Sequence, residues 1–289
     1  MLSKIVEIFE VGPRDGLQNE PVFISTEDKI ALTEGLARAG LPRIECASFV
    51  SPKWVPQMAE SAGVVSGATP GLAKLYVLAP NSRGLQDALQ TRVQGICVFI
   101  AATEGFSQAN TNISLAGAVE RVQTLITEFK HNAPGDVRLR GYISCATHCP
   151  YDGPVEPPTV ARLAEMLHRS GCDEISLGDT TGTAYPEQVA KMLDAVLQVV
   201  PAQSLAGHYH DTAERALANI DVSLGYGLRI FDSSIAGLGG CPYAPGAKGN
   251  LDTEKLYDHL TKKGYDILGN PNRLVLAAMA QFARKVVGR

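Results

Sequence analysis

The sequence contains no long hydrophobic run. Its longest apolar stretch covers about nine residues around Gly95–Thr103, about half of the ~18 residues that a membrane-spanning helix needs. Glu7 and Glu10 interrupt the first apolar segment, so the N-terminal region lacks the uninterrupted apolar centre of a secretory signal peptide. We therefore expect no membrane partner.

The sequence also lacks a strong charge imbalance and a high cysteine content. The 26 Lys and Arg residues nearly balance 30 Asp and Glu, the formal net charge is −4, and basic residues form no run. This composition argues against a nucleic-acid partner. Six cysteines in 289 residues are too few for a disulfide framework, and we expect a cytoplasmic protein.

Eight short apolar runs, rich in β-branched residues, predict β-strands. Several are apolar without strict alternation, which is typical of parallel strands that are covered on both faces. The predicted strands are Ile5–Val11, Arg43–Phe49, Lys74–Ala79, Gly95–Ala101, Arg138–Cys145, Glu174–Gly178, Leu205–His210 and Arg229–Ile235.

Segments with helical periodicity lie between these strands. Ser25 is the expected N-cap of the first helix and Gly40 follows its end, while Pro186 and Gly171 stand where helices prefer to start and stop. The predicted helices are Thr26–Ala39, Ser82–Thr91, Ser114–His131, Pro158–Ser170, Pro186–Val200, Thr212–Leu224 and Thr253–Lys263, with a last one in Pro271–Arg289.

This order of elements predicts the fold class. Eight β/α alternations in a chain just over ~250 residues long predict an α/β protein with a (β/α)8 TIM barrel. We expect residues 1–289 to form one catalytic domain, with 265–289 as a C-terminal helical extension. A doubly wound open sheet is the alternative, but Gly12-Pro-Arg-Asp-Gly16 is not the glycine-rich phosphate loop that such folds carry after the first strand.

Polar residues gather at the predicted C-terminal ends of the strands, where TIM-barrel enzymes place their chemistry. We expect the first strand to end in Arg14 and Asp15. The polar residues at the other ends include Glu45, Ser48, Cys145, His148, Asp179, His208 and His210. Polar side chains from five or six strands should therefore lie together at one end of the barrel.

The sharpest metal-site pattern is His208-x-His210. Residues i and i+2 of a strand point to the same face, so both imidazoles should enter the barrel together. A single histidine is more often a hydrogen-bonded structural group, but a same-face pair with Asp15 nearby predicts a site for a divalent cation.

The glycine-rich segment after the eighth strand carries a second set of candidates. Cys241 lies in its middle, and a thiol on a polar loop at the catalytic end is a candidate reactive group. Asn250 either supplies a carbonyl oxygen to the metal or caps the helix that begins near Thr253. Glu254 either has a catalytic role or only favours the N-terminus of that helix.

Cys145-x-x-His148-Cys149 resembles half of a zinc site. The sequence contains no second half with matching spacing, so this pattern is a weak indication of structural zinc. The role of these three residues stays open.

Four motifs resemble the 3-hydroxy-3-methylglutaryl-CoA lyase family, and the resemblance covers residues from about 4 to 265. The motifs are Gly12-Pro-Arg-Asp-Gly-Leu-Gln-Asn-Glu20, Ser48-Phe-Val-Ser-Pro-Lys-Trp-Val-Pro-Gln57, Gly207-His208-Tyr-His210-Asp-Thr and Gly237-Leu-Gly-Gly-Cys-Pro-Tyr-Ala.

The resemblance implies a TIM-barrel lyase that cleaves (S)-3-hydroxy-3-methylglutaryl-CoA to acetyl-CoA and acetoacetate with Mg²⁺ or Mn²⁺. The metal ligands that it implies are Asp15, His208, His210 and Asn250. The catalytic residues that it implies are Arg14, Glu45, Cys241 and Glu254, and the candidates for substrate binding are Arg14, Ser48, Arg140 and Asp179. His208 and a carboxylate beside the metal are both candidates for the base that removes the alcohol proton.

The resemblance also implies an acyl-CoA as the small-molecule partner, a bacterial cytoplasmic location and a homodimer or higher homo-oligomer. Condensing enzymes of the same superfamily are the alternative, since they share the Arg-Asp start and the His-x-His pair. The Cys241 segment favours the lyase. A non-enzymatic module that binds metal or CoA would leave Arg14 and Cys241 unexplained.

Overall fold

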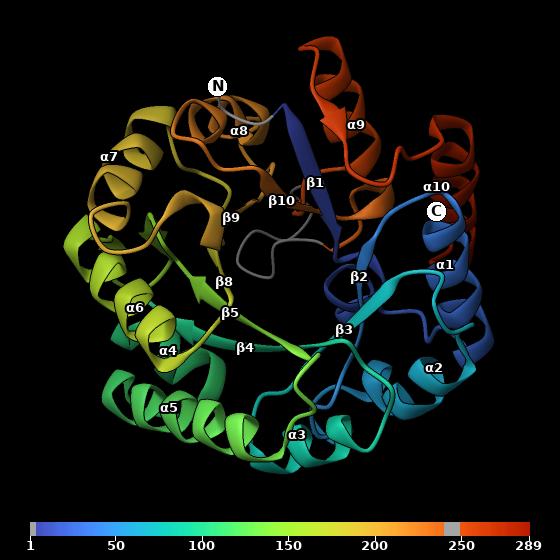
Figure 1. The fold of residues 1–289 in the computed structure, drawn as a ribbon, viewed down its shortest axis with the longest axis horizontal. Helices are drawn as coiled ribbons and strands as arrows, with labels where there is room; N and C mark the ends of the chain where they lie inside the picture. Colours follow the sequence, from blue (N-terminus) through green and yellow to red (C-terminus); the bar gives the residue numbers. More distant parts are fainter. Residues whose placement is uncertain (1–3, 240–248) are drawn as a thin grey trace. The chain divides into compact units, whose positions relative to one another are not determined.

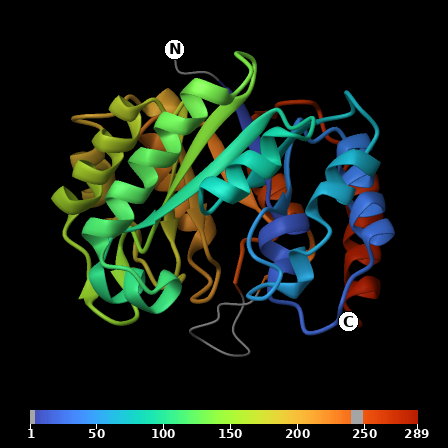
Figure 2. The ribbon, with the colours of Figure 1, turned by 90° about the horizontal axis from the view of Figure 1, so that it is seen from below.

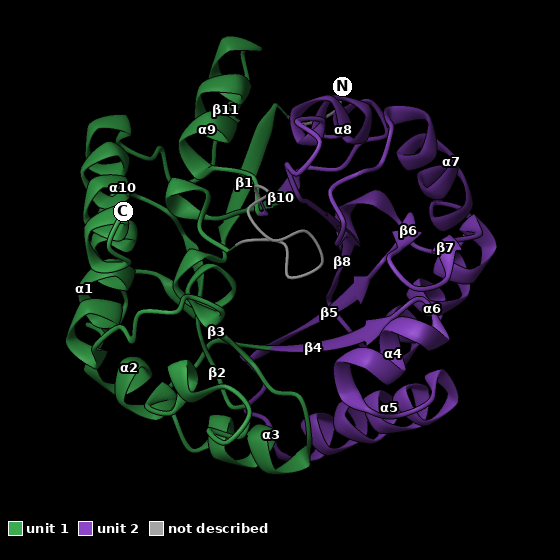
Figure 3. Ribbon diagram, turned by 180° about the vertical axis from the view of Figure 1, so that it is seen from behind, with its two compact units in different colours: residues 1–96, 231–240, 250–289 green, residues 97–230, 241–249 purple. Residues whose placement is uncertain are grey.

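The computed structural model describes residues 4–239 and 249–289. Two compact units divide the chain (Figure 3). Unit 1 consists of residues 1–96, 231–240 and 250–289, and unit 2 of residues 97–230 and 241–249. Among the described helices, none is long and apolar enough to cross a lipid bilayer.

Unit 1 contains parallel strands in the order β3-β2-β1-β11. Phe9 of β1 pairs with Arg43, and Arg43 pairs in turn with Lys74 of β3. The last part of β10 also belongs to this unit, and the Ser233 carbonyl accepts a hydrogen bond from the Val11 amide at 2.9 Å. The strands are β1 (Ile5–Glu10), β2 (Arg43–Ser48), β3 (Lys74–Leu78), β10 (Ile230–Ser233) and β11 (Asp266–Ile267).

Helices of unit 1 follow its strands in sequence. Helix α1 packs on both α2 and α10, and Figure 2 shows α10 in red beside α1 in blue. The predicted N-cap is confirmed, since the Ser25 side chain accepts a hydrogen bond from the Asp28 amide. The helices are α1 (Thr26–Arg38), α2 (Ser61–Gly67), α3 (Ser82–Leu89), α9 (Thr253–Lys262) and α10 (Arg273–Val286), with short turns η2 (Pro56–Met58) and η4 (Ile235–Gly237).

Unit 2 contains a second set of parallel strands, in which β8 pairs with both β5 and β9. The register places Arg140 beside Glu174 and Gly178 beside His208. A short antiparallel hairpin follows β5. The strands are β4 (Gly95–Ala101, from Cys97 onward), β5 (Arg138–Ser144), β6 (His148–Cys149), β7 (Gly153–Pro154), β8 (Glu174–Asp179) and β9 (Leu205–Tyr209).

Helices of unit 2 pack on one another in chain order, α6 on α7 and α7 on α8 (Figure 1). Pro186 is the first residue of α7, and Gly171 ends α6 with a φ of +112°, a left-handed conformation that glycine adopts without strain. The helices are α4 (Glu104–Thr111), α5 (Leu115–Asn132), α6 (Pro157–Ser170), α7 (Pro186–Val196) and α8 (Ala216–Gly225), with the turn η3 (Ala202–Ser204).

All predicted strands and helices are present, including the C-terminal helix, with ends that differ by a few residues. Sequence reasoning missed α2, α4, the hairpin and β11. Helix α2 contains two glycines and α4 is short and polar, so neither has the long apolar periodicity that identifies a helix. The single-domain interpretation of residues 1–289 stays a prediction.

We expect Gly95→Ala to destabilise the protein, because a β-carbon at Gly95 would meet the Tyr76 ring at 2.1 Å. Tyr76 has little freedom to move away, since its ring packs edge-on against Phe9 at 5.1 Å. Overpacking of this kind lowers the free energy of unfolding by about 1–3 kcal/mol, which urea denaturation would measure. Gly225→Ala is the matched control, because its β-carbon would meet no atom within 4 Å apart from its chain neighbours and the backbone of its own helix. Equal stability of the two variants would contradict this packing.

Candidate active site

A single π-helical turn, η1 (Gly12–Gly16), follows β1 and carries Arg14 and Asp15. The Val11 carbonyl accepts hydrogen bonds from the amides of Arg14, Asp15 and Gly16 at 3.1, 2.7 and 3.2 Å. The expectation that the first strand itself ends in Arg14 and Asp15 is wrong, because β1 ends at Glu10. Pro13 has no amide hydrogen for a strand ladder, and a tight turn presents both side chains instead.

Arg14 lies between two carboxylates. Its Nη2 donates to Glu45 Oε2 at 2.6 Å and its Nη1 donates to Asp15 Oδ1 at 2.5 Å. The Arg14 side chain is 8% exposed and that of Glu45 is fully buried. A buried guanidinium is stable only when its charge is paired and hydrogen-bonded, so these contacts fix the orientation of Arg14.

Asn250 lies beside the same turn. Its Nδ2 donates to Asp15 Oδ2 at 2.8 Å and to the Leu238 carbonyl at 3.1 Å. Both donor hydrogens face protein acceptors, so the amide oxygen is the atom that a cation would bind. Gly239, with φ of +91°, allows this approach, because a β-carbon there would lie 2.7 Å from Asn250 Nδ2.

In unit 2, His208 and His210 lie at the end of β9 and just after it. Their ring centroids are 5.2 Å apart, which confirms that the two imidazoles share one face of the strand. His208 is half-buried and His210 is buried. The His210 amide donates to the Asp179 carbonyl at 3.4 Å, so β8 and β9 together position this pair.

Tyr142 contacts His208 and was missed by sequence reasoning. Its ring meets that of His208 edge-on at 6.1 Å. Arg140 Nη1 donates to Tyr142 Oη at 2.8 Å, and Arg140 Nε donates to Glu174 at 2.5 Å. Positions 140 and 142 share a face of β5, which is the signal that could have found Tyr142. Arg140, buried and paired, supports this ring.

Asp179 and Ser48, both predicted to bind substrate, are buried. The Asp179 carboxylate accepts hydrogen bonds from Thr147, from Thr181 and from the Ala184 amide, the last at 3.0 Å. Burial raises the pKa of Asp179. These contacts organise the loop after β8. Ser48 Oγ in unit 1 has no hydrogen-bond partner among the residues that the structure describes.

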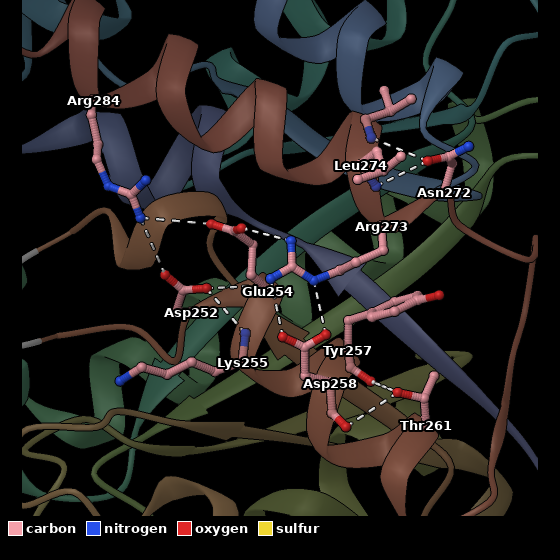
Figure 4. Close-up of polar contacts among 11 residues, drawn as sticks. Asp252, Glu254, Lys255, Tyr257, Asp258, Thr261, Asn272, Arg273, Leu274 and Arg284 are labelled. Atoms are coloured by element: carbon pink, nitrogen blue, oxygen red, sulfur yellow. Dashed lines mark hydrogen bonds and ion pairs between the residues drawn. The ribbon is translucent and has the colours of Figure 1, made fainter.

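Glu254 contacts helix α10. Its Oε1 pairs with Arg273 at 2.8 Å and its Oε2 lies 3.6 Å from Arg284 (Figure 4). Asp252 caps α9 by accepting from the Glu254 amide at 2.7 Å, and Arg273 also pairs with Asp258. The structure thus places Glu254 in a clamp between α9 and α10, and its catalytic role stays a prediction.

The remaining candidates are the cysteines. Cys145 and Cys149 are buried in one apolar cluster with Phe106, and burial raises the pKa of Cys145. Within residues 4–239 and 249–289, neither cysteine nor His148 belongs to a group of three metal-ligating side chains. Cys241 lies outside the described residues.

Sequence reasoning also missed Glu10, the last residue of β1, which is completely buried. Its Oε1 accepts from the amides of Gly12 and Ile235, both at 2.8 Å, and its Oε2 accepts from Thr253 Oγ1 at 2.7 Å. Burial outweighs these bonds and raises its pKa from the ordinary 4.5 to about 7. In the sequence, Glu10 is visible only as a charge that interrupts an apolar segment, which gives no sign of this contact.

Comparison with known proteins identifies close relatives over the whole chain. The HMGL-like family model matches residues 5–282. The 3-hydroxy-3-isohexenylglutaryl-CoA/hydroxymethylglutaryl-CoA lyase of Pseudomonas aeruginosa is 50% identical over 254 residues, which are 88% of this chain and 84% of the relative.

Two solved structures have the same fold as this chain. The HMG-CoA lyase of Brucella melitensis matches with a TM-score of 0.94 and 48% identity over 99% of each chain. An HMG-CoA lyase from Acinetobacter baumannii, solved with coenzyme A and 3-methylmalate, matches with a TM-score of 0.92 and 30% identity over 100% of this chain and 93% of the other. These likenesses confirm the predicted (β/α)8 TIM-barrel class with additional C-terminal helices.

We expect Glu10 to make stability depend on pH. Its folded pKa is above its unfolded value, so the folded state holds a proton that the unfolded chain releases. The contribution of Glu10 to the free energy of unfolding is therefore greatest below about pH 4.5, and it falls as the pH rises to about 7. The unfolding free energy of wild type minus that of Glu10→Gln should fall by roughly 3 kcal/mol over this range. Urea denaturation at several pH values measures it.

Glu120→Gln, which removes an exposed carboxyl from α5, is the control. A difference between wild type and Glu10→Gln that stays constant with pH would show that burial does not disfavour the Glu10 carboxylate.

Proposed function

Because this chain belongs to the HMGL-like family, we propose that the side chains of its candidate active site perform the carbon–carbon cleavage of hydroxymethylglutaryl-CoA lyases. The chain is a hydroxymethylglutaryl-CoA lyase, a carbon–carbon lyase. We propose that its reaction converts (S)-3-hydroxy-3-methylglutaryl-CoA to acetyl-CoA and acetoacetate. The condensing alternative loses its support, since the relatives at 50% and 48% identity are both lyases.

The orientation of Arg14 carries the proposed mechanism. Cleavage removes the proton of the C3 hydroxyl and breaks the C2–C3 bond, so that C3 becomes a ketone and the electron pair becomes a thioester enolate. Glu45 and Asp15 fix the orientation of the Arg14 guanidinium. We propose that this guanidinium donates hydrogen bonds to the enolate oxygen. Preorganised donors of this kind stabilise charge without reorganising during the reaction.

A divalent cation, Mg²⁺ or Mn²⁺, is proposed to bind Asp15, His208, His210 and Asn250. The donor set fits such an ion: a carboxylate and two imidazoles each offer one ligand atom, Asn250 adds an amide oxygen, and no thiolate is included. When bound, the cation would lower the pKa of the C3 hydroxyl and orient it.

The other proposed roles follow from chemistry and position. His208 is a candidate to receive the alcohol proton, although a histidine that binds a cation is a poor base, so a neighbouring carboxylate stays the alternative. Cys241, outside the described residues, is proposed to protonate the acetyl-CoA carbanion. Ser48, Arg140 and Asp179 are proposed to bind substrate together with Arg14. Glu45 and Glu254 are proposed to take part in catalysis.

The substrate class has independent support, because the Acinetobacter baumannii lyase was solved with coenzyme A. We therefore propose an acyl-CoA as the small-molecule partner. The homo-oligomeric assembly and the bacterial cytoplasmic location stay predictions.

His210→Ala should weaken Mn²⁺ binding together with acetoacetate release, because it removes a proposed ligand. Loss of a group that only hydrogen-bonds to a metal ligand already weakens metal affinity by about 10–100-fold. We therefore expect the Mn²⁺ Kd to rise at least tenfold in a titration followed by electron paramagnetic resonance. His131→Ala, a change at an exposed histidine of α5, should have no effect. Unchanged Mn²⁺ affinity in His210→Ala would remove this residue from the ligand set.

Arg14→Lys should lower kcat by about 10²–10³, or about 3–4 kcal/mol, because an ammonium group cannot contact both carboxylates and the enolate with a planar fork. Steady-state kinetics of acetoacetate release measure this effect. The control is Arg83→Lys, which makes the same change in an exposed pair with Asp87. A change in KM alone would assign Arg14 to substrate binding rather than to catalysis.

A further inference from the structure

Glu10 joins three separate segments of unit 1 through one buried carboxylate. Its two oxygens accept hydrogen bonds from the first residue of the η1 turn, from the first residue of η4 and from the first residue of α9. These residues are Gly12, Ile235 and Thr253. Because the carboxylate is completely buried, no solvent replaces these bonds, and each segment is held directly.

Each of the three segments leads to a proposed cation ligand. The η1 turn carries Asp15. The η4 turn leads to Leu238, whose carbonyl accepts from Asn250 Nδ2 at 3.1 Å. Thr253 lies three residues after Asn250, and its amide donates to the Ser234 carbonyl at 3.1 Å.

Glu10 and the backbone of the η1 turn are in close contact. A β-carbon at Gly12 would lie 2.6 Å from Glu10 Oε1 and 3.1 Å from the Ile235 amide nitrogen. The backbone of η1 therefore rests directly on the carboxylate. A displacement of Glu10 has to move Gly12, Ile235 or both.

We propose that Glu10 is a positioning residue, which sets the relative placement of Asp15 and Asn250 through its bonds to Gly12, Ile235 and Thr253. This inference rests on the proposed assignment of Asp15 and Asn250 as cation ligands. Glu10 does not itself touch the cation or the substrate.

Glutamine can replace Glu10 in this role. Its amide oxygen can accept from both backbone amides, and its NH₂ group can donate to Thr253 Oγ1. Thr253 Oγ1 lies 2.8 Å from Ser233 Oγ, so the threonine hydroxyl can turn and donate to Ser233 instead. Alanine at position 10 removes all three bonds and leaves two buried amides unpaired, which displaces the segments that they belong to.

The test compares Mn²⁺ affinity in Glu10→Ala and Glu10→Gln, measured by electron paramagnetic resonance on the purified full-length protein. We expect Glu10→Ala to raise the Mn²⁺ Kd by about 10–100-fold and Glu10→Gln to stay within about threefold of wild type. Ile8→Ala is the matched control, since Ile8 is completely buried on the same strand and makes none of these bonds. Its Tm should fall while its Mn²⁺ Kd stays unchanged.

Two results would overturn the inference. One is an equal rise in Kd for Glu10→Ala and Ile8→Ala at equal loss of Tm, which would show a general effect of destabilisation. The other is a Glu10→Gln variant as impaired as Glu10→Ala, which would show that the charge and not the hydrogen bonds is needed.

Thr253→Val provides a milder variant if Glu10→Ala does not fold. It deletes the bond to Glu10 Oε2 together with the contact to Ser233 Oγ, but it leaves both backbone bonds to Glu10 in place. We expect a rise in Kd of severalfold; an unchanged Kd would contradict the inference. His210→Ala separates the two proposals. If His210→Ala binds Mn²⁺ like wild type, the proposed cation site fails, whereas weak binding in His210→Ala with normal binding in Glu10→Ala rejects only the role of Glu10.

Discussion

A guanidinium can be buried only where its charge is paired, and unit 1 satisfies this requirement for Arg14. Glu45 from β2 and Asp15 from the same turn accept two of its hydrogen bonds. Removal of either carboxylate would leave part of a buried positive charge uncompensated, which is strongly destabilising. The register shift in β2 between Glu45 and Ala47 adds an irregularity beside this pair, and such irregularities often lie next to active sites. The orientation that the proposed chemistry needs is thus also the one that makes burial possible.

Backbone hydrogen bonds determine the conformation of the η1 segment that carries Arg14. A regular strand through Val11 would direct alternate side chains to opposite faces. The π-helical turn gathers three amides on the Val11 carbonyl instead, and it places Arg14 and Asp15 side by side. Glu10 supports the turn from beneath through Gly12. The buried hydrogen bonds of Glu10 therefore help to give this turn one defined geometry.

The fold was predictable because every β/α alternation contains a short apolar run or a clear helix boundary, such as Ser25 or Gly171. The His208 and His210 pair was predictable because strand periodicity fixes which side chains share a face. Glu10 and Tyr142 were not found, because their importance arises from contacts with residues far away in sequence, as between Glu10 and Ile235. The clamp on Glu254 was missed for the same reason: a helix N-terminus explains an acidic residue equally well, and the sequence does not say that Arg273 lies opposite.

That clamp ties the C-terminal helix to the segment that carries Asn250. Arg273 bridges Glu254 and Asp258 of α9, and α10 buries Leu276, Ala280 and Ala283. Detachment of α10 would expose these apolar side chains and would leave Glu254 and Asp258 without the guanidinium of Arg273. The first turn of α9 begins three residues after Asn250, so opening of α10 is expected to weaken this turn as well. Contacts of α10 with the first turn of α9 therefore add to the stability of the segment that follows Asn250.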